Sequence, residues 1–149
     1  MSKKKVEAKE IKEVNAAKVS YFLGVGRRKE AVARVKLTLD KEAVMLVNGM
    51  PADKYFSGEV AKKILVEPFK CTNTLNRFKV DIKVYGSGRN SQLGAVVHGI
   101  SRALLVVDTP KYRAILKDKG YLTRDPRTRE RRKVRTGGKA RRAKQSPKR

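Results

Sequence analysis

The sequence is poor in the residues that build disulfides, metal centres and catalytic sites. Cys71 is its only cysteine, so no internal disulfide or cysteine-rich zinc site can form, and we expect a half-buried thiol beside a turn. His98 is its only histidine, and it lies opposite the apolar stripe of a predicted helix, which favours a structural hydrogen-bonding partner over a catalytic base. Paired carboxylates at metal-binding spacing and nucleophile signatures are also missing. The sequence therefore predicts no catalytic residue, no metal and no cofactor.

Long apolar runs are missing as well. No run approaches the roughly 20 residues that span a bilayer, and the basic C-terminal segment has no interleaved Leu, Phe or Trp for an interface. The N-terminal residues lack the apolar centre of a signal peptide, and Glu7, Glu10 and Glu13 argue against a transit peptide. We expect a cytoplasmic protein with no membrane partner.

Acidic residues are scarce. The chain has 14 Asp and Glu against 38 Lys and Arg, which gives a formal net charge of +24. Residues 117–149 alone carry 15 basic and 3 acidic side chains. Self-repulsion on this scale destabilises a compact state unless a polyanion neutralises it, so the composition favours a nucleic-acid partner.

The composition divides the chain into three segments. Residues 1–20 mix Lys and Glu with few large apolar groups and are predicted to be disordered or partly helical. Residues 21–122 show the patterned apolar residues of a globular α+β domain. Residues 123–149 have no large apolar residue other than Val134 and are predicted to form a long extended basic tail.

Two stretches of the middle segment alternate apolar and polar residues as strands do. In ARVKLTLD the apolar positions are Val35, Leu37 and Leu39, and RFKVDIKVYG repeats the pattern farther along the chain. With the turns around Asp40 and Asn48, residues 21–48 are predicted to form a small antiparallel meander.

Three helices are expected beside these strands. The first begins after Ser57 as N-cap and must stop before Pro68, and the second covers residues 92–107 with one apolar stripe. The third has Thr109 as N-cap and is closed by Gly120. Together these elements predict a mostly antiparallel sheet with helices packed on one face.

The stretch GSGRNSQLGA follows a predicted strand and opens a helix, which is the setting of a dinucleotide-binding glycine loop. It begins G-x-G, but Ser91 replaces the third glycine of that motif. Asp108 follows the same helix directly, whereas the ribose-binding acid of such a fold ends a second parallel strand. A polynucleotide phosphate at the helix N-terminus, beside Arg89 and Asn90, suits a basic chain better, and a simple turn stays open as an alternative.

Small residues are unusually frequent in the second predicted helix: Gly94, Ala95, Gly99, Ser101 and Ala103. A glycine inside a helix costs about 1 kcal/mol against alanine, so we expect another group to approach this backbone closely. One candidate is a neighbouring helix or sheet. The other is a phosphodiester backbone drawn in by Arg89 and Arg102.

Arginine outnumbers lysine in the tail. The guanidinium is a planar fork for phosphate and stacks on unpaired bases, which suits irregular folded RNA better than a uniform duplex. Gly137, Gly138 and Pro147 oppose a regular helix, so the tail could follow a winding groove and order on binding. The run Arg27, Arg28 and Lys29 adds a second basic cluster, although most short charge runs are solvated turns.

Five segments in order resemble the bacterial type of small-subunit ribosomal protein number nine: LGVGRRKEAVARV, VNGMPADKYF, GAVVHGISRALL, KGYLTRDPRTRERRKV and KARRAKQSPKR. The resemblance runs from about Tyr21 to Arg149. It implies a fold like the second domain of ribosomal protein number five. It also implies a structural role in which the domain binds ribosomal RNA in the subunit head, near neighbouring ribosomal proteins, while the tail threads through the RNA. In that family the final Lys-Arg contacts P-site transfer RNA, a role that falls here on Lys148 and Arg149.

The resulting hypothesis is an RNA-binding protein of translation without enzymatic activity. Its expected ribosomal-RNA contacts are Arg27, Arg28, Lys29, Arg89, Asn90, Arg102, Arg124, Arg127, Arg129, Arg131, Arg132, Lys133, Arg141 and Arg142. Two alternatives stay open. One is a nucleoid or duplex-coating protein in which the tail is a generic polycation, and the other is a nucleotide-dependent enzyme built on the glycine loop.

Overall fold

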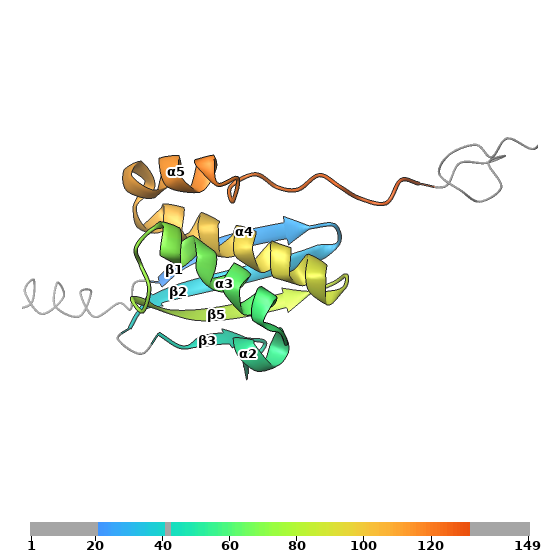
Figure 1. Ribbon diagram of the computed structural model, residues 1–149, viewed down its shortest axis with the longest axis horizontal. Coiled ribbons are helices and arrows are strands. Elements are labelled where there is room, and N and C mark those ends of the chain that lie inside the picture. Colours follow the sequence, from blue (N-terminus) through green and yellow to red (C-terminus); the bar gives the residue numbers. More distant parts are fainter. Residues whose placement is uncertain (1–20, 41–42, 132–149) are drawn as a thin grey trace, which may run out of the picture.

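A computed structural model describes residues 21–40 and 43–131. A five-stranded sheet forms its base, with the strands β1 (Tyr21–Arg28), β2 (Ala31–Leu39), β3 (Met45–Val47), β4 (Met50–Pro51) and β5 (Phe78–Tyr85). Their spatial order is β1-β2-β5-β3-β4. All neighbours are antiparallel except β3 and β5, which run parallel (Figure 1). The sheet is therefore mixed.

The predicted meander over residues 21–48 is wrong at its third strand. β5 lies beside β2, and β3 pairs with the far side of β5. Eight pairs of residues join β2 to β5, whereas only three join β3 to β5. The longer strand β5 therefore lies next to β2, and the short β3 lies farther out. Asn48 extends the short pairing, because its side chain accepts from the Val84 N–H and donates to the Val84 carbonyl, both at 2.9 Å. The predicted turn at Asn48 is confirmed as the β3–β4 hairpin.

In the part of the chain that the structure describes, four helices accompany the sheet: α2 (Ala52–Tyr55), α3 (Glu59–Cys71), α4 (Arg89–Val107) and α5 (Thr109–Asp118). α4 packs along β1 and β2, and it also contacts α3 and α5 (Figure 1). Alternate residues of β5, from Phe78 to Val84, are buried under these helices, while the residues between them are exposed. The α+β class with helices on one face is confirmed, and it is consistent with the fold implied by the resemblance.

The first predicted helix differs from α3 at both ends. Gly58, rather than Ser57, is the N-cap, and the helix continues through Pro68 to Cys71. A proline in a helix interior costs about 3 kcal/mol, but Pro68 is buried with Leu65 and Phe69 on the face that packs into the core. Burial of this apolar face offsets the lost hydrogen bond, so the helix does not stop before the proline.

The second and third predicted helices correspond to α4 and α5. The apolar stripe of α4 is confirmed, with Val96, Ile100 and Leu104 fully buried. The N-cap of α5 is Asp108 rather than Thr109, because the Asp108 backbone is extended and its carboxylate accepts from the Lys111 N–H at 3.2 Å. Gly120 follows α5 with φ +74°, a conformation that favours glycine at a helix end.

The small residues of α4 allow β1 to approach the helix backbone. A Cβ atom added to Gly26 would collide with the Ala95 carbonyl, and one added to Gly24 would collide with the Gly99 carbonyl. The neighbouring sheet therefore explains these small residues. The alternative of a phosphodiester backbone at this face of α4 is wrong, because β1 fills the space.

Candidate nucleic-acid interface

The basic run at the end of β1 is split between the two faces of the sheet. Arg27 is exposed on the face away from the helices. The Arg28 side chain lies on the helix side, close enough to Gly94 that a Cβ atom there would meet its Cδ at 2.6 Å. Lys29 is an exposed residue of the β1–β2 turn and has φ +52°. The three residues thus present cations in different directions around one hairpin.

The N-terminus of α4 lies next to this hairpin. A Cβ atom on Gly86, which has φ +81°, would collide with the Glu30 carbonyl, so the glycine loop and the hairpin are in close contact. Gly88 caps α4 without a side-chain hydrogen bond, and Arg89 and Asn90 follow it as exposed residues. Gln92 fixes the loop by donating to the Gly86 carbonyl at 3.1 Å. This helix end has the exposed backbone N–H groups and the cation that attract phosphate.

The arrangement required for a dinucleotide site is not formed. β5 precedes the glycine loop, but α4 leads directly into α5, and no strand follows among residues 89–131. The sheet neighbours of β5 are an antiparallel β2 and a short parallel β3 that comes earlier in the chain. The nucleotide-binding alternative therefore lacks its second parallel strand.

The start of the predicted tail is fastened to the same end of the domain. The Asp125 carboxylate lies 3.0 Å from the Arg28 guanidinium and 2.7 Å from that of Arg127. Hydrogen bonds and the charge of Arg127, followed by the charge of Arg28, hold the pKa of Asp125 far below its ordinary value. Just before it, the Tyr121 hydroxyl hydrogen-bonds to Glu67 of α3, and burial with this carboxylate raises the pKa of Tyr121.

These contacts set the path of the chain out of the domain. After α5 it runs beside α4 toward the β1–β2 hairpin and leaves there (Figure 1). The exposed residues Arg124, Arg127, Arg129 and Arg131 follow that path. The role of Asp125 was not predicted from the sequence. The one signal for it is that Asp125 is an isolated acid, followed by proline, in the basic stretch TRDPRTR.

Arg102 lies away from this end. It is 13 residues after Arg89 on α4, a separation of about 20 Å at the α-helical rise, so the two arginines do not share one phosphate. Its Nη1 donates a 2.7 Å hydrogen bond to the Val25 carbonyl. β1 is an edge strand, so Arg102 satisfies a carbonyl group of this edge and has a structural role there.

His98 has a matching task one helical turn earlier. Its Nδ1 accepts from the Arg27 N–H at 3.3 Å, which confirms the predicted structural role. Burial, followed by the charge of Arg102, lowers the pKa of His98, while a hydrogen bond with the backbone of Leu122 opposes the shift. The neutral imidazole thus links β1, α4 and the start of the tail.

Several predicted contacts lie outside the described residues: Arg132, Lys133, Arg141, Arg142, Lys148 and Arg149. The predicted N-terminal segment, residues 1–20, lies outside them too. Within residues 21–40 and 43–131, no three His, Cys, Asp or Glu side chains gather as a metal site would require. Over the same ranges, no helix has both the length and the apolar character to cross a membrane.

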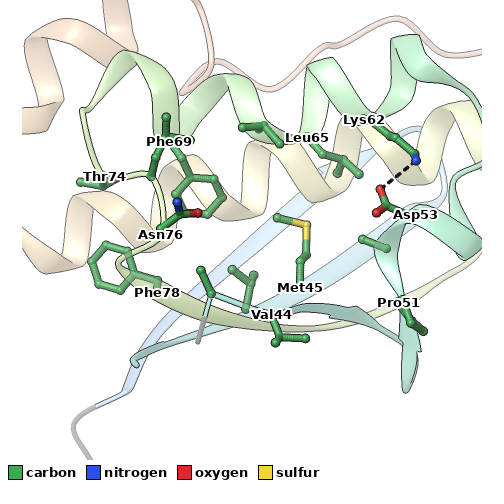
Figure 2. A pocket seen from close by; sticks show the side chains of 15 residues that line it. Val44, Met45, Pro51, Asp53, Lys62, Leu65, Phe69, Thr74, Asn76 and Phe78 are labelled. Atoms are coloured by element: carbon green, nitrogen blue, oxygen red, sulfur yellow. Dashed lines mark ion pairs between the residues drawn. The ribbon is translucent and has the colours of Figure 1, made fainter. Parts of the chain in front are cut away.

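An apolar pocket of about 320 Å³ lies between α3 and the β3–β4 hairpin. Figure 2 shows Met45, Leu65 and Phe69 pointing into it, with the ion pair of Lys62 and Asp53 at 3.5 Å on its rim. Cys71, at the end of α3, is half-buried as predicted. None of the residues predicted to bind RNA lines the pocket, so it is separate from the basic end of the domain.

A small α+β domain that gathers exposed cations at one end and continues into a basic segment defines a basic nucleic-acid-binding protein. Residues 26–149 match the family described as ribosomal protein S9/S16. The small ribosomal subunit protein uS9 of Dehalococcoides mccartyi is 46% identical over 116 residues, which cover 78% of this chain and 86% of that protein. The uS9 protein of Anaeromyxobacter sp. strain K is 47% identical over 109 residues, covering 73% and 82%.

The chain belongs to the ribosomal protein S9/S16 family. It is therefore an RNA-binding ribosomal protein with a structural role in translation, as the resemblance in its five segments implied.

Proposed function

We propose that this protein is a constituent of the small ribosomal subunit that binds ribosomal RNA in the subunit head and contacts P-site transfer RNA with its last residues. One structural observation carries the proposal. The β1–β2 hairpin, the N-terminus of α4 and the start of the tail converge at one end of the domain, through the contacts of Gly86 with Glu30 and of Arg28 with Asp125. Such an end gathers phosphate-binding groups from three separate parts of the chain.

The contacts with ribosomal RNA divide into two groups. At the converging end, Arg27, Lys29, Arg89 and Asn90 are exposed and form the domain's share. Arg28 adds a contact with RNA where the tail leaves the domain, and Arg102 adds one beside the edge of β1. The tail's share is Arg124, Arg127, Arg129, Arg131, Arg132, Lys133, Arg141 and Arg142. Phosphate contacts of this kind position a protein on folded RNA.

The end of the tail is assigned to transfer RNA. The family match extends to residue 149, so it includes Lys148 and Arg149. Because Asp125 is held at the hairpin, residues 126–149 are 24 residues that start from a fixed point. Fully extended, they span up to about 80 Å. The proposal also includes contacts with neighbouring ribosomal proteins and a location in cytoplasmic ribosomes, with no membrane partner.

The assignment of Lys148 and Arg149 is tested by removing them. Small subunits carrying the shortened chain should assemble normally but bind P-site transfer RNA more weakly. The same loss is expected when both residues are replaced, as Lys148→Gln with Arg149→Gln. The matched control is Lys3→Gln with Lys4→Gln, because it also removes two positive charges near a terminus. Unchanged P-site affinity in the shortened chain would remove the assignment.

A second experiment separates ribosomal binding from generic coating of a duplex. Scrambling residues 128–149 at constant composition keeps Asp125 and Arg127 in place and preserves the charge. On our proposal the scrambled chain should comigrate poorly with the small subunit in a sucrose gradient. Undiminished comigration, or equal retention on DNA, would mean that the tail acts only as a polycation.

A further inference from the structure

The sheet face opposite the helices is uncovered in the described structure. Gly24, Gly26 and alternate residues of β2 and β5 point to the helices, so the intervening residues point the other way. Five of these outward residues are basic: Arg27, Arg34, Lys36, Lys79 and Lys83. Asp81 is the single acid that the strand residues bring to this face. The open face is therefore strongly electropositive.

The strand register places two of these cations against each other. Arg34 on β2 pairs directly with Lys83 on β5, whereas the next outward residue of β2, Lys36, pairs with Asp81. Like charges opposite each other destabilise a sheet, because their side chains are only about 5 Å apart at Cβ. An anion bound between them would remove the repulsion.

Aromatic residues flank this charged centre. Tyr21 is 53% exposed and Tyr85 is 54% exposed, whereas tyrosine is usually of intermediate burial. Tyr21 pairs with Thr38 and Tyr85 with Val32, so the two rings are separated by six residues of β2, about 20 Å. The Lys36 ammonium lies 4.7 Å from the centre of the Tyr21 ring, which combines a cation with a stacking surface.

We propose that this open sheet face is a second RNA-binding surface, which takes an unpaired segment of RNA. Bases stack on Tyr85 and Tyr21, while phosphates lie over Arg34, Lys36 and Lys83. Exposed aromatic rings on a sheet stack on bases that are not paired, and every base offers such a face. The excess of basic residues selects a polyanion over an ordinary protein surface. The inference rests on the proposed function only in naming ribosomal RNA as the source of the segment.

Ultraviolet cross-linking of intact small subunits, with mapping of the cross-linked peptides, tests the location. We expect RNA cross-links on peptides that contain Tyr85 or Tyr21, in addition to those on the tail. Cross-links confined to the tail would overturn the sheet-face proposal and leave the proposed function standing. Cross-links on neither part would overturn both. Amine cross-links from Lys79 and Lys83 to another ribosomal protein, without RNA cross-links, would assign the face to a protein partner and overturn the proposal.

Variants of the full chain test the chemistry. Tyr85→Leu should weaken binding to a single-stranded RNA oligonucleotide by about fivefold to a hundredfold, the usual loss for one stacked base, and Tyr85→Phe should not. Arg34→Gln with Lys83→Gln should lower affinity more than Lys63→Gln with Lys70→Gln, an equal charge change on exposed residues of α3. Equal losses in the two pairs, together with full binding by Tyr85→Leu, would show that the face contributes only to a general positive field and would overturn the proposal.

Discussion

The Arg28 guanidinium lies 3.0 Å from the Asp125 carboxylate and joins the hairpin at the end of β1 to the first residues of the tail. The two residues are 97 positions apart in the sequence, yet their ion pair decides where the tail leaves the domain. The Arg28 side chain is itself held over Gly94 of α4. A rigid element thus supports one partner of the pair, and a segment without secondary structure supplies the other.

Asp125→Asn should release the start of the tail. The neutral amide loses its charge-assisted contacts with Arg28 and Arg127, so backbone order parameters of residues 123–131 should fall while those of the sheet stay unchanged. Asp118→Asn is the matched control, because Asp118 is an exposed acid at the end of α5. Equal order parameters in the two variants would contradict the role of Asp125. The depressed pKa means that this contact persists at neutral pH and is lost only as strong acid protonates the carboxylate.

The single histidine gives the domain one titration in the neutral range. Because its pKa is lowered from 6.5, the unfolded chain takes up a proton at a higher pH than the folded chain does. The contribution of the neutral His98 to the free energy of unfolding should therefore be largest above pH 6.5. It should fall as the pH drops from 6.5 toward the folded pKa of His98. Nuclear magnetic resonance can follow the one imidazole directly, and a midpoint above 6.5 would refute the burial argument. His98→Gln should lose this part of the pH dependence.

Gly26→Ala should be severely destabilising. Its new methyl group would collide with the Ala95 carbonyl in the backbone of α4, which has no flexible side chain that could move aside. We expect a loss of about 3 kcal/mol or more in the free energy of unfolding, measured with urea. Gly88→Ser is the control, since no atom lies within 4 Å of the added Cβ and serine is a good N-cap. A mild effect at Gly26 would mean that β1 and α4 are less closely packed than described.

Arg102 and Arg89 should differ in what they contribute to stability. Arg102→Gln removes the hydrogen bond to the Val25 carbonyl and should lower the free energy of unfolding by about 1 kcal/mol. Arg89→Gln should leave stability unchanged, because Arg89 is an exposed residue at the start of α4, and should weaken binding to ribosomal RNA. Thermal unfolding and filter binding on both variants check the pair. Unchanged stability in Arg102→Gln, or a loss of stability in Arg89→Gln, would contradict this prediction.

Local periodicity was enough to predict much of the fold. The alternation from Phe78 to Val84 and the stripe of Val96, Ile100 and Leu104 both reflect burial against a single face, and burial leaves a clear sequence pattern. The position of β3 was not predictable in this way. Three residues carry too little pattern to show whether they pair with β2 or β5. Pro68 was misleading because its local cost is outweighed by packing that depends on the tertiary structure.

The candidate site was predictable only in part, for a similar reason. Charge and residue type were enough to single out the arginines of the tail and the hairpin. They did not show that Arg27 and Arg28 face opposite sides of the sheet, or that Asp125 closes back onto Arg28. The pairing of Arg34 with Lys83 also depends on the register of β2 and β5, which residue composition does not contain.

The two edge strands of the sheet, β1 and β4, affect how readily one copy of the protein can pair with another. At one margin, His98 and Arg102 occupy an N–H and a carbonyl group of β1 that another strand would need. At the other, β4 has only two residues, and Pro51 has no N–H to donate. Among the described residues, both margins are therefore poor templates for adding a strand from another copy, which should disfavour edge-to-edge aggregation.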